Sequence, residues 1–211
     1  MVHSTWLDFW ARVAIVVPAF LVAVSFHEFS HALVASWLGD DTAKKRGRLT
    51  LNPVAHIDLL GLLFLIIFKI GWATPVPIDH RNFKFPRLYS IVAALAGPFS
   101  NFVLAFACFV CIKYLPIALL SPSVVKTFMQ ILSATAWVNV MLGVFNLLPI
   151  PPLDGSHIIT ALLSKPFPRL VMWLYRYSLL FILILFMFPS FQQALLELII
   201  KTEQFIKHLV F

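Results

Sequence analysis

Residues 13–38 read VAIVVPAFLVAVSFHEFSHALVASWL, an apolar run long enough to cross a bilayer as one helix. His27, Glu28 and His31 interrupt this run within five residues. Ionisable side chains are expensive at membrane depth, where they mark function more often than packing. The stretch therefore predicts a membrane helix with a functional site inside it.

The composition of the whole chain is also that of a membrane protein. Of 211 residues, 61% are hydrophobic and 12% are charged, and the mean hydropathy is +0.92. A water-soluble fold would leave large apolar surfaces uncovered at this composition. No polar linker, low-complexity tract or charge block marks a second domain. We predict a single membrane domain over 1–211, with a core at 10–165 and C-terminal helices at 169–211.

Four stretches are apolar enough for spanning helices, which need about 20 residues each, and they lie at 10–38, 88–115, 126–148 and 169–189. The run 59–70 is too short to span, and Gly61, Gly71 and two nearby prolines bracket it. It predicts a re-entrant loop or β-hairpin within 50–80. At membrane depth, the backbone of such a segment must be covered by other parts of the protein. Residues 191–211 mix charges with leucines and isoleucines, as in an interfacial amphipathic helix. The predicted fold is an all-α polytopic bundle of about four to six transmembrane helices.

Basic residues orient the bundle, because short cytoplasmic loops carry the excess of Lys and Arg. Three clusters flank the predicted spans, at 44–48, 81–87 and 165–176. All three are cytoplasmic together only if 59–70 enters and leaves on one side, which places the N-terminus outside. The formal charge of +7 fits contact with the lipid bilayer rather than nucleic acid, because the basic clusters lie beside apolar segments.

The polar residues of the opening stretch have the spacing of a zinc site. His27 and His31 are four residues apart, so a helix presents both imidazoles on one face, and with Glu28 they form the H-E-x-x-H pattern. Glu28 lies about 100° around the helix, where its carboxylate can act as a general base without ligating the metal. The alternative is a histidine pair that hydrogen-bonds within the bundle, which the cost of ionisable groups in a membrane disfavours.

A third ligand must come from elsewhere, because a catalytic zinc takes three protein ligands and keeps one position open. Asp154 stands out among the nine acidic residues. It lies in FNLLPIPPLDG, at the inner end of the third predicted helix, with no basic residue near enough to pair with it. The three prolines of this stretch prevent a regular helix and let the chain turn the carboxylate into the bundle. His27 and Asp154 then share one predicted depth, toward the cytoplasmic leaflet.

HEFSH at 27–31 and NLLPIPPLDG at 146–155 resemble the two defining motifs of the site-2 protease family of intramembrane zinc metalloproteases. LNPVAHIDLLG, GWATPVPI and AGPFSN fit the same family, so the resemblance covers 27–155. The pattern is similar to the small clade that lacks a PDZ domain. The resemblance implies one Zn²⁺ per chain, held by His27, His31 and Asp154, with Glu28 as catalytic base.

The same resemblance implies a substrate class and a location. The expected reaction is hydrolysis of a peptide bond within or beside the transmembrane helix of a single-span membrane protein. The expected location is a prokaryotic plasma (inner) membrane, which the protein crosses several times. Peptide bonds in a lipid-embedded helix are shielded by their own hydrogen bonds, so we expect the substrate to unwind and add as a strand to an edge within 50–80.

Three further polar residues are candidates for binding substrate. Asn146 matches a family asparagine associated with holding the substrate backbone, since an amide both donates and accepts; a helix–helix hydrogen bond is its alternative role. Asn52 and His56 either position substrate or support the re-entrant segment, and His56 is not needed as a metal ligand. Asn101 is expected to close the helix packing beside Gly97.

Two other functions stay open at this point. A zinc transporter also carries histidines and acids in membrane helices, but it needs successive polar sites across the bilayer. The outer halves of 88–115 and 126–148 are nearly bare of such sites. A catalytically inert membrane chaperone on the same fold is the second alternative, and the intact set of His27, Glu28, His31 and Asp154 argues against it.

Overall fold

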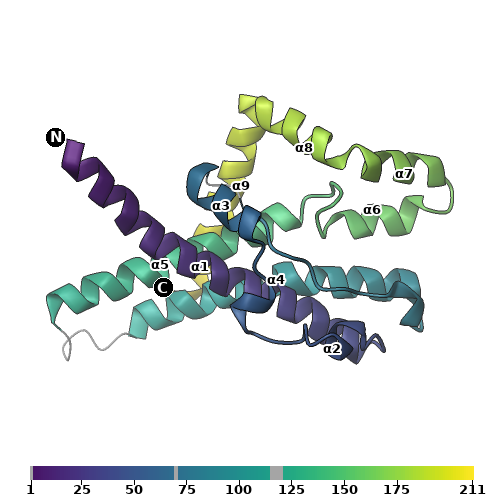
Figure 1. Ribbon diagram of the computed structural model, residues 1–211, viewed down its shortest axis with the longest axis horizontal. Helices are drawn as coiled ribbons and strands as arrows, with labels where there is room; N and C mark the ends of the chain where they lie inside the picture. Colours follow the sequence, from purple (N-terminus) through teal and green to yellow (C-terminus); the bar gives the residue numbers. More distant parts are fainter. Residues whose placement is uncertain (1, 69–70, 115–120) are drawn as a thin grey trace.

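The computed structural model describes residues 2–68, 71–114 and 121–211, and over these residues it contains helices and no strand. Its centre is formed by three long helices, α1 (Val2–Trp37), α4 (Pro86–Tyr114) and α5 (Pro122–Asn146). Each of the three packs against the other two, and Figure 1 shows them lying alongside one another. This three-helix bundle is the frame on which the polar residues are placed.

Three helices are long and apolar enough to cross a membrane, at Phe9–Trp37, Pro86–Tyr114 and Pro122–Asn146. A fourth crossing is possible if α7 (Pro168–Arg176) and α8 (Ser178–Met187) together make one span. These findings confirm the predicted all-α polytopic membrane fold. The three or four candidate crossings lie at or below the lower end of the predicted range of about four to six.

The fourth predicted span, 169–189, is not one straight helix. α7 and α8 meet at an angle of 64°. The hydroxyl of Ser178 donates to the carbonyl of Tyr175 at 2.9 Å, and such local side-chain bonds compete with the helical ladder. The predicted span at 169–189 therefore contains a sharp bend, which apolar composition alone does not indicate.

Residues 50–80 form a re-entrant excursion built on a helix. The segment contains η1 (Pro53–Ala55) and α3 (Leu59–Phe68). An isolated antiparallel bridge joins Ile57 to Ala73, so the two flanks of α3 meet. The predicted β-hairpin is wrong for the residues that the structure describes, because the leucine-rich run has high helix propensity and no period-two alternation. The last two residues of the predicted run, 69–70, lie outside the described part of the chain, as does the outer loop at 115–120.

The C-terminal part begins with α6 (Ser156–Leu163) and ends with α9 (Pro189–Val210). The sequence predicted an interfacial helix at 191–211. In the structure, the apolar side of α9 instead packs against α4 and α5, where Ile199 and Ile206 are buried in a cluster with Phe109 and Val140. Protein therefore covers one side of α9, whereas Leu198, Phe205 and Leu209 of the same helix are exposed.

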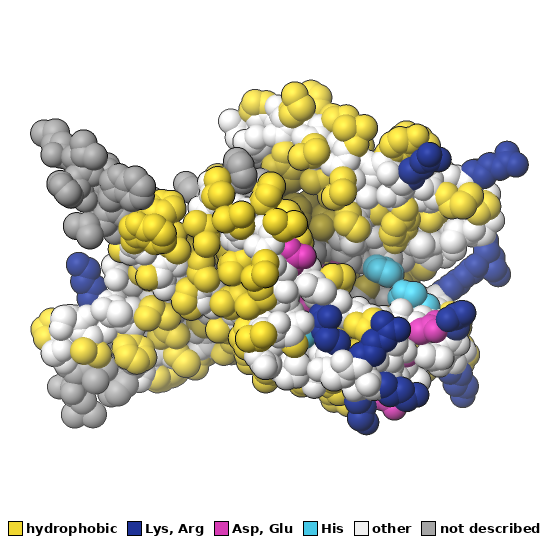
Figure 2. All heavy atoms as spheres, in the orientation of Figure 1, with side chains coloured by type: hydrophobic (Ala, Val, Ile, Leu, Met, Phe, Trp, Pro, Cys, Tyr) yellow, Lys and Arg dark blue, Asp and Glu magenta, His cyan; other side chains and the backbone are white. Residues whose placement is uncertain are grey.

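Charged and apolar side chains are separated along the bundle. Lys and Arg side chains gather mainly at the end where α1 leads into α2 (Thr42–Lys45), whereas apolar side chains cover the middle (Figure 2). This distribution is that of a membrane protein with one strongly basic face.

The basic end is held together by a buried carboxylate. Asp40, 1% exposed, accepts hydrogen bonds from the N–H of Asp79 at 2.7 Å and from the amide of Asn82 at 2.7 Å. It also accepts from the N–H and hydroxyl of Thr42, at 3.1 and 2.5 Å. Burial raises the pKa of Asp40, but these hydrogen bonds from Thr42, Asn82 and Asp79 outweigh it and hold the pKa below its ordinary value. Asp40 thereby joins the end of α1 to η2 (His80–Asn82).

Candidate metal centre

Three of the predicted site residues converge inside the bundle. The Nε2 atoms of His27 and His31 lie 3.0 Å apart, and Oδ2 of Asp154 lies 3.0 Å from the first and 3.3 Å from the second. His27 and His31 are buried, and Asp154 is partly buried. The helix periodicity of α1 brings the imidazoles together, as their spacing predicted.

Asp154 reaches the imidazoles because the chain turns back tightly after α5. The N–H of Gly155 donates to the carbonyl of Asn146 at 2.7 Å. A Cβ atom on residue 155 would lie 2.2 Å from the carbonyl oxygen of Leu147, so only glycine fits this turn. The proline-rich stretch therefore ends in a close backbone contact that fixes Asp154 beneath α1.

The hydrogen bonds of the two imidazoles fix their tautomers. Nδ1 of His31 lies 2.8 Å from the carbonyl oxygen of Ala93, which can only accept, so Nδ1 carries the proton. Nδ1 of His27 lies 2.7 Å from Oδ1 of Asn101. Both N–H groups of that amide donate elsewhere, to the Ala23 carbonyl and to Asn139. In the neutral rings, both Nε2 atoms therefore present lone pairs to the same point.

With both rings neutral, the two Nε2 lone pairs and Oδ2 of Asp154 therefore face one another. Oδ2 of Asp154 is buried and has no hydrogen-bond donor among the described residues. Such a cluster is unfavourable unless a cation balances it. Donors about 2.0–2.1 Å from a tetrahedral zinc lie about 3.3 Å apart, close to the observed spacings. Two imidazoles and one carboxylate are also the donor types of catalytic zinc sites, so the residues present fit this metal.

Gly97 makes room for the two imidazoles on the α4 side. A Cβ atom on residue 97 would lie 2.4 Å from Nε2 of His31 and 2.7 Å from Cε1 of His27. These separations are far inside van der Waals contact. The absence of a side chain at position 97 is therefore a condition for the convergence of the three donors.

Glu28 lies beside this cluster and contacts the re-entrant segment. Its Oε2 atom accepts a hydrogen bond from the N–H of Val76 at 2.8 Å. Among the residues that the structure describes, nothing hydrogen-bonds to its other oxygen, Oε1. Glu28 is buried, 9% exposed, so one oxygen is anchored and the other is available for a reacting group.

Comparison with known proteins identifies the family of this chain. Residues 116–186 match the profile of Peptidase family M50. YwhC of Bacillus subtilis is 39% identical over 177 residues, which are 80% of this chain and 78% of YwhC. The chain belongs to peptidase family M50, the site-2 protease family.

Two more distant relatives agree with this assignment. Rip2 of Mycolicibacterium smegmatis is 32% identical over 190 residues, 88% of this chain and 71% of Rip2. MJ0392 of Methanocaldococcus jannaschii is 25% identical over 159 residues, 75% of this chain and 36% of MJ0392. All three relatives carry the words zinc metalloprotease in their names, and no solved structure matches the chain. This member of family M50 is a zinc metalloprotease with zinc as its cofactor, rather than the zinc transporter that the sequence left open.

The other predicted site residues of this M50 protease lie outside the cluster. The amide of Asn146 donates to the carbonyl of Leu142 in its own helix at 3.1 Å. The side chain of Asn52 caps η1 by accepting from the N–H of Val54 at 3.1 Å. Their roles toward substrate stay predictions, and the contacts seen here are local ones.

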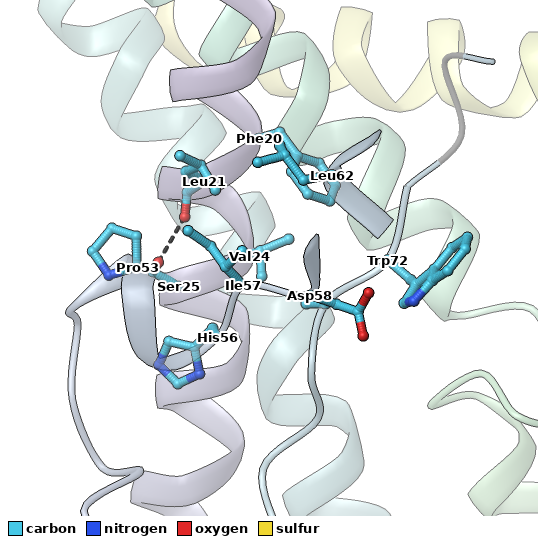
Figure 3. A pocket seen from close by; sticks show the side chains of 11 residues that line it. Phe20, Leu21, Val24, Ser25, Pro53, His56, Ile57, Asp58, Leu62 and Trp72 are labelled. Atoms are coloured by element: carbon cyan, nitrogen blue, oxygen red, sulfur yellow. Dashed lines mark hydrogen bonds between the residues drawn. The ribbon is translucent and has the colours of Figure 1, made fainter. Parts of the chain in front are cut away.

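His56 is more enclosed than the sequence suggested. It is 1% exposed, and its Nε2 donates to the carbonyl of Thr50 at 2.8 Å. Its Nδ1 atom is buried without a hydrogen-bond partner among the described residues. Figure 3 shows the ring on the wall of a small pocket beside Ser25 and Asp58. A direct contact of His56 with substrate would need this segment to move, so the structure favours a role in supporting the re-entrant segment.

Sequence reasoning missed the groups that orient the site. The carbonyl of Ala93 and the N–H of Val76 are backbone groups, and residue type does not predict the contacts that such groups make. Asn101 was expected to pack helices, and in the structure it contacts His27 directly. Asn139 was not singled out, although an asparagine in the middle of an apolar helix is itself a signal.

Proposed function

We propose that this protein is an intramembrane protease that hydrolyses peptide bonds within or beside the transmembrane helices of single-span membrane proteins. In this proposal, His27, His31 and Asp154 hold the zinc ion and Glu28 is the catalytic base. The observation that carries it is the convergence of the His27, His31 and Asp154 side chains beside α1, a helix that is apolar enough to span a bilayer.

The chemistry divides between the metal and Glu28. Zinc, when bound, acts as a Lewis acid that polarises the scissile carbonyl group and makes water a better nucleophile. Oε1 of Glu28 accepts a proton from the attacking water while a bond forms between the water oxygen and the carbonyl carbon. Glu28 then returns that proton to the amine as the C–N bond breaks. The hydrogen bond from Val76 to Oε2 keeps the carboxylate oriented during both transfers.

The re-entrant segment offers an edge beside Glu28 on which an unwound substrate can lie. The N–H of Thr74 donates to the carbonyl of His56 at 2.9 Å. Neighbouring residues of an extended segment direct their backbone groups to opposite sides, so the N–H and carbonyl of Ala73 face away from that pairing. A substrate strand paired with Ala73 would run past Val76 and Glu28. This arrangement supports binding by strand addition.

Arg48 keeps that edge in place. Its Nη2 atom donates to the carbonyl oxygens of Thr74 at 2.8 Å and of Pro75 at 3.3 Å. Arg48 follows α2, so the contact joins the basic end of the bundle to the segment that precedes Val76. Residues 73–76 therefore carry both the proposed docking edge, which is the backbone N–H and carbonyl of Ala73, and the N–H of Val76 that contacts the carboxylate of Glu28.

The proposed location is a prokaryotic plasma (inner) membrane, with the metal centre toward the cytoplasmic leaflet. The basic end of the bundle supports the orientation, because Lys and Arg accumulate on the cytoplasmic side. His31 lies in the last two turns of α1, which leads to this basic end. The relatives in Bacillus, Mycolicibacterium and Methanocaldococcus support the prokaryotic setting.

The proposal is tested by locating the bond that the enzyme cuts. The purified full chain is incubated in detergent with a panel of single-span membrane proteins, and the products are mapped by mass spectrometry, with Glu28→Gln as the inactive control. We expect cuts within or next to the membrane segment that are absent with the control. Cuts confined to soluble loops far from the membrane segment would contradict the intramembrane assignment.

A further inference from the structure

We propose that Asn139, on α5, positions the zinc ligand His27 through one intervening side chain, Asn101 on α4. The inference rests on the proposed function, in which Nε2 of His27 binds zinc. The amide of Asn139 donates to the Thr135 carbonyl at 2.8 Å, and the amide of Asn101 donates to Oδ1 of Asn139 at 2.8 Å. Nδ1 of His27 completes the series by donating to Oδ1 of Asn101 at 2.7 Å.

The direction of every hydrogen bond in this series is fixed by backbone carbonyls. The Thr135 carbonyl can only accept, so Asn139 must direct its NH₂ group to it and its oxygen toward Asn101. The Asn101 NH₂ group then donates to this oxygen and, with its second N–H, to the Ala23 carbonyl at 3.1 Å. Only the Asn101 oxygen is left for His27, which must therefore carry its proton on Nδ1.

Burial makes this arrangement hard to replace. Asn101 and Asn139 are both 0% exposed, and His27 is 7% exposed. Rotating either amide by half a turn would set oxygen against oxygen and leave N–H groups without acceptors, which is unfavourable in a buried environment. The series thus joins all three long helices and ends on a nitrogen of the metal-binding ring.

If Asn101 and Asn139 only held the helices together, the hydrogen bond from His27 to Asn101 would not be needed. A single hydrogen bond between Asn101 and Asn139 would already hold α4 to α5. Here the oxygen of Asn101 accepts from the ring whose other nitrogen faces the metal centre. Groups that accept from the second nitrogen of a histidine ligand fix its tautomer and ring orientation, and their loss typically weakens metal binding 10–100-fold.

The decisive measurement is the zinc affinity of the full chain in detergent, obtained by competition with a chelator. We expect Asn101→Leu to weaken zinc binding about 10–100-fold and Asn139→Leu to weaken it by a smaller factor, about 3–10-fold. Because Asn139 acts only through Asn101, the double variant should bind zinc no more weakly than Asn101→Leu alone.

Thr135→Val is the matched control. It removes a buried hydroxyl that donates to the Ile131 carbonyl at 2.8 Å, one turn from Asn139, while the Thr135 carbonyl stays in place. We expect its zinc affinity to equal that of the wild type. Thermal unfolding of the zinc-free proteins separates an effect on folding from one on the site. If Asn139→Leu does not fold, Asn139→Ala takes its place.

A second readout does not depend on the metal. ¹⁵N NMR of the zinc-free protein, with the His27 signal assigned by its absence in His27→Gln, should show a proton on Nδ1 in the wild type. The proton should redistribute to Nε2 in Asn101→Leu. Equal zinc affinities for Asn139→Leu and Thr135→Val, or additive effects in the double variant, would overturn the inference while leaving the proposed function intact. Absence of zinc binding by the wild type would instead remove the proposed function itself.

Discussion

At the scale of single residues, the metal centre depends as much on an absent side chain as on the ligands. The backbone of α4 approaches the imidazoles of α1 so closely at Gly97 that a methyl group there would overlap both rings. The glycine therefore sets the depth to which His27 and His31 can enter the helix interface.

We expect Gly97→Ala to abolish zinc binding, because its Cβ would need the space of Nε2 of His31, 2.4 Å away. The zinc content of the purified variant should fall to background, and cleavage should fall with it. Gly143→Ala is the matched control, since its Cβ would meet the ring of Phe102, 2.6 Å away, instead of a ligand. A Gly97→Ala protein that retains zinc would show that the close approach is not required.

Sequence alone could predict which three side chains converge, but not the groups that support them. His27 and His31 follow from helix spacing, and the prolines before Asp154 indicate where the chain must turn. The partners of the second ring nitrogens could not be predicted, because no spacing rule connects position 27 with position 101 or position 101 with position 139. These contacts depend on how α1, α4 and α5 pack, which a single sequence does not encode in any local pattern.

At the scale of elements, hydropathy predicted the long helices and failed at the short ones. α1, α4 and α5 correspond to three predicted spans, because about 20 apolar residues have one stable form in lipid. α3 lies in the segment for which the sequence left a re-entrant loop and a β-hairpin open, because a run of about ten apolar residues is too short to span a bilayer. The extended segment after α3 is the element that contacts Glu28.

The docking edge of this segment is tested by Ala73→Pro, which removes the N–H that we assign to substrate pairing. We expect kcat/KM for a membrane substrate to fall by at least about tenfold, the equivalent of about 1.4 kcal/mol, with unchanged zinc content. Ala73→Ser retains the N–H and should stay close to wild type. Equal loss of activity in both variants would point to side-chain packing rather than strand addition.

Asp40 gives an element-scale prediction for pH. Its folded pKa is lower than its unfolded one, so its contribution to stability is present above the unfolded pKa of about 3.9 and is lost as the pH falls through the lower folded value. We expect Asp40→Asn to lower the stability of the zinc-free protein by about 1–3 kcal/mol at pH 7. The difference should shrink below about pH 4. A difference in thermal unfolding that stays constant from pH 7 to pH 3 would contradict this role of the ionised carboxylate.

At the scale of the whole molecule, the charge distribution and the metal centre point to one side of the membrane. The basic end lies where α1 leads into α2 (Figure 2), and the turn that carries Asp154 meets the same half of α1. A metal centre at this depth is reached more directly from the basic side than from the opposite one, where α4 ends and α5 begins.

This orientation is tested with single cysteines in a background of Cys108→Ala and Cys111→Ala. Lys45→Cys should be protected from a membrane-impermeant thiol reagent in intact cells and become reactive after permeabilisation. Ser123→Cys, at the opposite end of the bundle, should react in intact cells. The reverse pattern of labelling would invert the proposed topology and place the metal centre toward the outer leaflet.

The central claim is that His27, His31 and Asp154 bind zinc while Glu28 acts on water. It is tested most directly by measuring zinc content and membrane-substrate cleavage together, for the wild type, Glu28→Gln and Asp154→Asn. We predict about one zinc per chain in the wild type and in Glu28→Gln, with cleavage only in the wild type. Asp154→Asn should lose both zinc and cleavage. Cleavage by Glu28→Gln at the wild-type rate, or full zinc content in Asp154→Asn, would contradict this account.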